Sequence, residues 1–190
     1  MLGEASARAI CGLCRALSLE GWRWEDGQLP HLPLLESFQW AANFREADMY
    51  YDVIEYLGDL KSLTRLELAN FDSWAYDFRP IQDLPKLQEL CIRSSPGLAA
   101  DMLKESNKFT SLRRLQISGP FYDQETTDSE EEATRDISAP WPRIDDLVEY
   151  IYNLPQIEEL SSNFRQLLRM MKRRSEARKR KIPTRLVYFT

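Results

Sequence analysis

The chain has 190 residues, of which 43% are hydrophobic, and a formal net charge of −5. This length fits one domain, and this composition suffices for an extended core. The sequence has no run of 18 apolar residues, and its N-terminus carries an early acid without a continuous apolar segment, so neither a membrane-spanning helix nor a secretion signal is expected. We therefore expect a cytoplasmic or nuclear protein that does not act in a membrane.

One phrase, L-x-x-L-x-x-L-x-L, recurs along the chain with other apolar residues at some of the leucine positions. Copies occupy residues 11–19, 32–40, 60–68, 84–92, 109–117 and 154–162. The fourth residues of successive copies are 21, 28, 24, 25 and 45 positions apart. A repeat of roughly 20–29 residues built on L-x-x-L-x-L is typical of leucine-rich repeats. We predict an α/β leucine-rich-repeat solenoid with a parallel β-sheet on its concave side and irregular helices and loops on its convex side.

The predicted elements follow the copies in chain order, as one domain over residues 1–190 with about six to seven repeats. Each copy ends in a predicted strand, and a weaker seventh copy adds a strand at residues 186–189. Helices are predicted over residues 4–14, 46–57, 98–106, 142–151 and 164–180, with one irregular turn between residues 71 and 80. We expect Gly58 to end the second helix, Asn163 to cap the last helix and Pro183 to end it.

The long step of 45 residues contains an acidic segment without apolar periodicity, residues 123–138. We expect this segment to be a mobile surface insertion. A basic helix over residues 163–181 follows, and the region from Arg165 to Arg185 carries ten Arg or Lys and one acid. Its densest basic patch comprises Lys172, Arg173, Arg174, Arg178, Lys179, Arg180 and Lys181. This patch is typical of a nuclear-import signal or a phosphate-binding surface, or of a solvated helix face.

Two cysteines, Cys11 and Cys14, have the C-x-x-C spacing of a redox pair or of half a zinc site. Both occupy positions that other copies fill with Leu, Phe or Ile, so we interpret them as small buried apolar residues. The remaining soft ligands, Cys91 and His31, belong to no second paired motif. The sequence therefore predicts no metal site and no cofactor.

Catalytic motifs are absent from the sequence. It contains no Gly-rich phosphate loop, no G-x-S-x-G and no H-E-x-x-H. Acidic pairs such as Asp145-Asp146 and Glu158-Glu159 are adjacent in sequence, so their side chains diverge. We predict a protein that is not an enzyme.

Two surfaces are candidates for binding a protein partner. The residues between the strand leucines face out of the concave sheet, where Arg65, Glu89 and Arg114 alternate in sign on adjacent strands. Aromatic residues gather instead in the loops that follow the strands, at Trp22, Trp24, Trp74 and Tyr76. Because aromatic anchors dominate binding energies, we predict the loop edge as the main contact, with Arg65 and Arg93 as secondary contacts. The alternative is that these rings seal the core.

The phrase L-P-x-L-x-x-L-x-L, at residues 84–92 and in part at 154–160, resembles the irregular repeats of F-box-type leucine-rich-repeat proteins, especially divergent fungal ones. The resemblance covers most of residues 11–189. It departs from the family pattern in lacking the asparagine ladder, for which Asn70 is the nearest candidate, and an F-box before the first repeat. It implies a protein-binding function, as the substrate-recognition part of a ubiquitin-ligase adaptor or a fragment of one.

We therefore expect a noncatalytic protein–protein interaction module, either monomeric or part of a larger complex. The alternative is a nuclear protein, or one associated with nucleic acid or another anionic surface, that acts through its basic C-terminal helix. Nucleic-acid binding has weak support, because the basic patch carries neither interleaved aromatic residues nor a known recognition motif.

Overall fold

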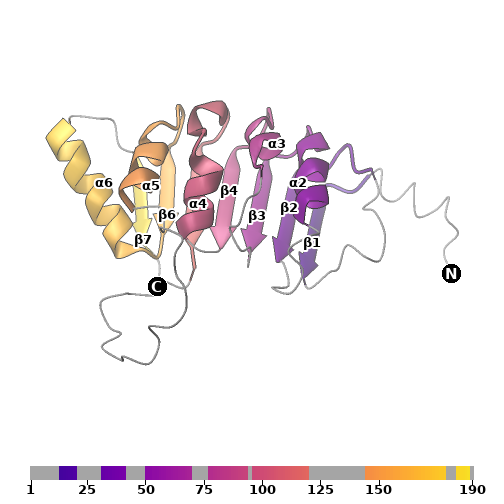
Figure 1. Ribbon diagram of the computed structural model, residues 1–190. Helices are drawn as coiled ribbons and strands as arrows, with labels where there is room; N and C mark the ends of the chain where they lie inside the picture. The colour runs from indigo at the N-terminus through magenta and orange to yellow at the C-terminus, as the bar shows by residue number, and fades with distance from the viewer. Residues whose placement is uncertain are drawn as a thin grey trace, which may run out of the picture.

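The computed structural model describes residues 13–20, 31–41, 50–69, 77–93, 96–119, 144–178 and 183–188. A seven-stranded parallel β-sheet, in which the strands follow one another in chain order, organises these residues (Figure 1). The strands are β1 (Ala16–Glu20), β2 (Ser37–Ala41), β3 (Arg65–Ala69), β4 (Glu89–Arg93), β5 (Arg114–Ser118), β6 (Glu159–Ser162) and β7 (Arg185–Tyr188). The predicted α/β class and parallel sheet are confirmed, and so is the closing strand expected from the weak seventh copy.

The repeated phrase determines the register of the sheet. Leu66 of β3 pairs with Leu90 of β4, and Leu90 pairs in turn with Leu115 of β5. Before each of the strands β1 to β5, one carbonyl oxygen accepts two N–H groups from the start of the next strand; that of Thr64 does so from Gln88 and Glu89, at 2.8 and 2.9 Å. Equivalent residues of successive copies therefore lie in straight columns across the sheet.

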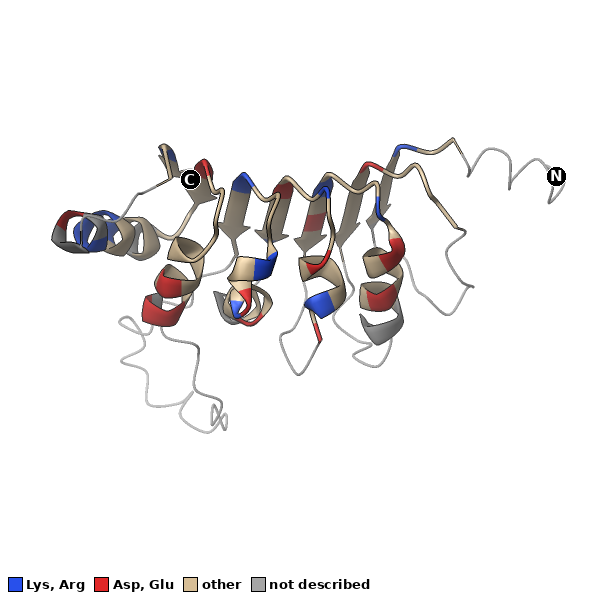
Figure 2. Ribbon diagram, turned by 90° about the horizontal axis from the view of Figure 1, so that it is seen from above, with Lys and Arg blue, Asp and Glu red and all other residues tan. Residues whose placement is uncertain are grey.

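The helices lie along one face of the sheet (Figure 2). They are α2 (Tyr50–Asp59), α3 (Arg79–Gln82), α4 (Pro96–Leu103), α5 (Ile144–Tyr152) and α6 (Arg165–Arg178), with a 3₁₀ turn, η3 (Ser106–Lys108), after α4. Helix α6 packs against α5, β6 and β7 at the end of this layer. No described helix covers the opposite face of the sheet, which we call the open face. None of the described helices is both long and apolar enough to cross a membrane.

The core fills the space between the sheet and the helix layer. Its strand-side residues are the leucines of the phrase, such as Leu66, Leu90 and Leu160, each at most 1% exposed. The helix side contributes apolar residues such as Leu57 and Val148, which are fully buried. Burying one such side chain contributes about 1.5–3 kcal/mol to folding. Successive copies therefore share one continuous core.

Gly58 does not end its helix as predicted, because α2 continues to Asp59. A Cβ atom at position 58 would lie 2.5 Å from the Cβ of Pro80, which belongs to α3. The glycine thus permits close packing between two helices. The sequence around Gly58 does not indicate this role, because it depends on the position of Pro80.

The start of α6 also differs from the prediction. The side-chain amide nitrogen of Asn163 donates to the carbonyl oxygen of Gly119 at 3.3 Å. The Ser162 hydroxyl instead accepts the N–H of Phe164 at 3.0 Å. Asn163 therefore links the ends of β5 and β6. The neighbouring serine, not the asparagine, accepts a backbone N–H group at the start of α6.

Cys14 is half-buried rather than fully buried, since β1 is the first strand of the sheet and has a described neighbour on one side only. Leu13 and Cys14, the last two residues of the helix predicted over residues 4–14, are not helical. The rest of that helix, which includes Cys11, and the insertion predicted over 123–138 lie outside the described residues.

Candidate functional site

A column of alternating charges crosses the open face. Its members pair in register across β3 to β7, and they are Arg65, Glu89, Arg114, Glu159 and Arg185. We call this set the charge column. Arg65 lies 3.8 Å from Glu89, and Arg185 lies 3.5 Å from Glu159, measured between guanidinium nitrogen and carboxylate oxygen. Arg114 also forms an ion pair with Glu89. Figure 2 shows the two signs alternating along the strand starts.

The arginines of the charge column reach further into solvent than the glutamates. The side chains of Arg65, Arg114 and Arg185 are 55%, 57% and 71% exposed, whereas those of Glu89 and Glu159 are each 26% exposed. The guanidinium groups are thus the more accessible partners of these ion pairs. A partner approaching the open face therefore meets mainly guanidinium groups.

Glu67 lies beside the charge column, in the next column of outward residues. Its carboxylate lies 2.9 Å from the Arg93 guanidinium and 3.7 Å from that of Arg65, and its side chain is only 5% exposed. We expected Glu67 to face out between two leucines, and it does, but the two arginines cover it. The ion pairs offset the cost of removing the carboxylate from water. The Glu67 carboxylate thereby holds the two exposed guanidinium groups in place.

Cys91 is the neighbour of Glu67 on β4 and is also buried on the open face. Burial raises the pKa of its thiol, and a hydrogen bond with Arg93 acts in the opposite direction. The thiol is therefore neutral near pH 7, which makes it a poor nucleophile. Among the described residues, no group of three or more His, Cys, Asp or Glu side chains could hold a metal ion.

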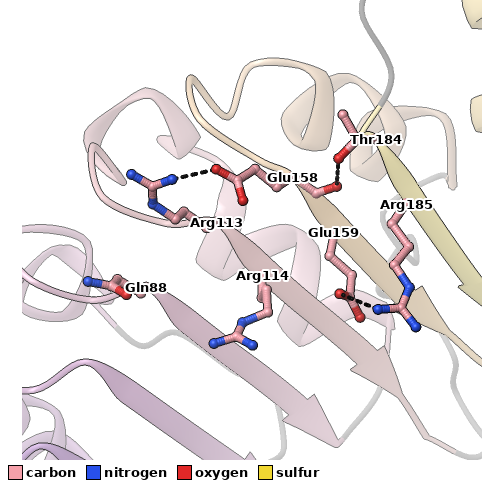
Figure 3. Close-up of a pocket in the computed structure, with 7 residues that line it drawn as sticks. All are labelled: Gln88, Arg113, Arg114, Glu158, Glu159, Thr184 and Arg185. Carbon is pink, nitrogen blue, oxygen red and sulfur yellow. Dashed lines mark hydrogen bonds and ion pairs between the residues drawn. The ribbon is translucent and has the colours of Figure 1, made fainter.

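A polar hollow lies at the strand starts of β4 to β7 (Figure 3). It is lined by Gln88, Arg113, Arg114, Glu158, Glu159, Thr184 and Arg185. Arg113 forms an ion pair with Glu158, and the Thr184 hydroxyl donates to the Glu158 carbonyl oxygen at 2.9 Å. The hollow thus continues the charge column towards the strand starts. We did not predict Arg185 as a site residue, although its place in the weak seventh copy was the available signal.

The residues predicted to bind a partner fall into two groups. Arg65 and Arg93 lie on neighbouring strands, and the structure brings them together over Glu67. The aromatic residues of the predicted loop edge lie outside the described residues, namely Trp22, Trp24, Trp74 and Tyr76.

The basic patch on α6 differs from the prediction at Arg174. Its guanidinium pairs with Glu149 at 2.7 Å and also with Asp145, and its side chain is only 25% exposed. Arg174 therefore connects α6 to α5 and is not a free surface cation. Lys172 and Arg173 are exposed, and Arg178 ends the helix. The remaining patch residues, Lys179, Arg180 and Lys181, lie outside the described residues.

The apolar side of α6 packs against the body of the protein. Leu167 and Met171 are buried, and Leu168 packs against the core. The Tyr152 hydroxyl of α5 donates to the carbonyl oxygen of Met171. Helix α6 is thus attached to the body through both apolar and polar contacts.

Comparisons of the chain with protein-family models, with curated proteins and with solved structures gave no match.

Proposed function

We propose that the protein is a leucine-rich-repeat solenoid, with the open face as its concave surface. The in-register leucines, the sheet that adds one parallel strand per copy and the single layer of helices support this architecture. In such a stack each repeat buries its apolar side against its neighbours, which leaves the outward columns for recognition.

We further propose that the protein is a noncatalytic interaction module that binds a protein partner on the open face. The observation that carries this proposal is the charge column, whose exposed members are arginines and whose carboxylates lie beneath them. Arginine is enriched among the residues that dominate binding energies. Guanidinium groups that carboxylates already hold lose less conformational entropy on binding than free ones do.

Within this proposal the protein acts in the cytoplasm or nucleus, as a monomer or as part of a larger complex. Its resemblance to F-box-type repeats suggests a narrower form, in which the chain selects substrates for a ubiquitin-ligase adaptor. The ion-paired carboxylates and the neutral Cys91 thiol of the open face favour binding over catalysis.

The proposal is tested by affinity capture from cell lysate with the full chain as bait. Wild type is compared with an Arg65→Ala/Arg114→Ala variant and with Lys104→Ala, whose exposed side chain follows α4 on the helix side. We expect the open-face variant to lose partner proteins by about tenfold or more, since two arginines of the charge column are removed together, and Lys104→Ala to retain them. Equal recovery with all three baits would exclude the open face as the binding surface.

The alternative function, binding of nucleic acid or another anionic surface through α6, has less support. Arg174, one of the seven residues of the basic patch, is already paired with two carboxylates of α5. Its charge therefore stabilises the packing of α6 on α5. Replacing the exposed patch residue Arg173 tests this alternative by its effect on salt-dependent binding to nucleic acid.

A further inference from the structure

We propose that the open face recognises an acidic segment of a protein partner in polyproline II conformation, in which carboxylates recur at every third residue. This inference rests on the proposed function and narrows it to one class of partner. It follows from the spacing of the column arginines, from their exposure and from the carboxylates between them.

The spacing comes from the strands that carry the arginines. Arg65, Arg114 and Arg185 lie in one column on β3, β5 and β7, with one strand between each pair. Adjacent strands are about 4.8 Å apart, so successive arginines stand roughly 9.6 Å apart along the column. A polyproline II chain has three residues per turn and advances about 3.1 Å per residue, so every third side chain lies on the same face, about 9.3 Å apart, which matches the arginine spacing. In an extended strand, side chains three residues apart point to opposite faces, so that conformation does not match.

The exposure of the arginines determines which sign of charge the partner must carry. The column arginines are more than half exposed, and Arg93 and Arg113, at 53% and 52%, widen the basic band on either side. Guanidinium groups bind carboxylates through two parallel hydrogen bonds, so an acidic side chain is the natural ligand of each arginine.

The carboxylates of the column exclude a densely charged polyanion. Glu89 and Glu159 lie between the arginines, and a continuous chain of negative charges would meet one of them at every second strand. Double-stranded DNA carries a charge about every 1.7 Å of its axis, far denser than the arginines. A peptide with two uncharged residues between successive acids passes over the glutamates without repulsion. The column therefore favours a spaced acidic peptide over nucleic acid.

Glu67 adds a positioning function to this surface. It contacts Arg65 and Arg93 together and so holds the start of the basic band in one arrangement. Replacing it with Gln removes the charge that holds both guanidinium groups but keeps the shape of the side chain. We expect this change to weaken binding of the periodic peptide by about threefold, through lost pre-organisation of two exposed groups.

The test compares two capped fluorescent peptides of identical composition, ten residues long, with three glutamates each. One carries them at positions 2, 5 and 8, and the other has them contiguous at positions 4 to 6; a single-stranded oligonucleotide is the third ligand. Binding to the full chain is measured by fluorescence anisotropy at physiological salt. We expect the periodic peptide to bind about fourfold tighter than the contiguous one, because it forms three exposed ion pairs where the contiguous peptide forms one, and each pair contributes roughly twofold.

Variants identify the residues responsible. Arg114→Ala should weaken binding of the periodic peptide by about twofold, the contribution of one ion pair. Arg114→Lys should weaken it less, because it keeps the charge and loses only the paired hydrogen bonds. Lys104→Ala should leave both affinities unchanged. The unfolding midpoint of each variant shows whether the domain remains folded.

Equal affinity for the two peptides, or preferential binding of the oligonucleotide, would overturn the proposal. These results differ from a failure of the proposed function. If lysate partners are lost from the Arg65→Ala/Arg114→Ala bait but the peptides do not differ, the open face binds proteins by another chemistry. If the partners remain on that bait, the binding surface itself is wrong.

Discussion

Gly58 of α2 lies so close to Pro80 of α3 that a Cβ atom at position 58 would stand 2.5 Å from the proline Cβ. In an open helix position, replacing Gly with Ala stabilises a protein by about 0.5–1 kcal/mol. Here the added methyl group must displace a neighbouring helix, and overpacking costs about 1–3 kcal/mol. We therefore predict that Gly58→Ala lowers the free energy of unfolding, measured by urea denaturation.

The matched control for this change is Glu55→Ala, an exposed position on the same helix. It should change the free energy of unfolding by less than about 0.5 kcal/mol, the usual range for surface substitutions. A Gly58→Ala variant more stable than wild type would show that α2 and α3 can move apart without lowering the free energy of unfolding.

Leu66 and Leu90 pair with each other in the buried column and are almost wholly inaccessible. Replacing either with Ala should lower the free energy of unfolding by about 2–5 kcal/mol, because each leaves a cavity in the shared core. Glu67→Gln should cost less than about 1 kcal/mol, because the guanidinium groups that it leaves are exposed and solvated. Equal losses in all three variants, measured by chemical denaturation, would mean that Glu67 supports the fold as much as the leucines do.

The strand register was predictable from sequence because it depends on one local pattern. A one-residue slip would turn every leucine of a strand away from the core, so the phrase permits one alignment only. The same reasoning identified the alternation of Arg65, Glu89 and Arg114, which the pairing of β3 to β5 confirms.

What the sequence did not predict depends on contacts between distant segments. Gly58 has the sequence signature of a helix stop, and its packing role depends on the position of Pro80. The burial of Glu67 depends on how far two arginine side chains extend over it. Arg174 pairs with Glu149, 25 residues away, and only the packing of α6 on α5 brings them together. Periodicity within a segment carries none of this information.

The thiols should differ in reactivity. Burial raises the pKa of the Cys91 thiol, so its thiolate fraction near pH 8 is small. In a Cys11→Ser background we predict that iodoacetamide labels half-buried Cys14 first, and that labelling of Cys91 increases as the pH rises beyond 9. Site-resolved mass spectrometry gives both rates. Faster labelling of Cys91 at pH 7.5 would show that the open face admits reagent and activates this thiol.

The same pKa shift affects stability with a definite sign. Because the folded state raises the pKa, it retains the proton better than the unfolded chain does. This contribution to stability is complete below the unfolded pKa and is lost as the pH rises through the folded value. Cys91→Ala should therefore reduce the decline of stability above about pH 9, as measured by denaturation at several pH values.

Arg174 and Arg173 are adjacent on α6 but should have different functions. Arg174→Gln removes the contacts to Glu149 and Asp145 and should lower the free energy of unfolding by about 0.5–1 kcal/mol. A double-mutant cycle with Glu149→Gln measures the direct coupling. Arg173→Gln should leave stability unchanged and should weaken salt-dependent binding to nonspecific nucleic acid if the basic patch binds anions. Unchanged binding after Arg173, Lys179 and Lys181 are all replaced by Gln would leave α6 with a structural function alone.

The residues of the predicted loop edge lie outside the described residues, but in the sequence they follow strands, and the ends of parallel strands share one edge of the sheet. Trp74 and Tyr76 follow β3 in the sequence, and Arg93 ends the neighbouring strand β4. A partner bound over Arg65 and Arg93 is therefore expected to reach this edge. Replacing Trp74 with Ala should weaken binding of a captured partner by about 30-fold, corresponding to an aromatic anchor of roughly 2 kcal/mol, and should leave the unfolding midpoint unchanged.

The comparison of affinity with unfolding midpoint decides between the two interpretations of these rings. A ring that seals the core would lower the midpoint when it is removed, since truncating a buried aromatic side chain costs about 3–5 kcal/mol of stability. Trp22→Ala and Trp24→Ala extend the test to the loop after β1, and Arg65→Ala supplies the open-face reference. The edge prediction is wrong if the aromatic variants lose stability and keep their affinity, while Arg65→Ala loses affinity and keeps its stability. In that case the arginines of the open face bind the partner.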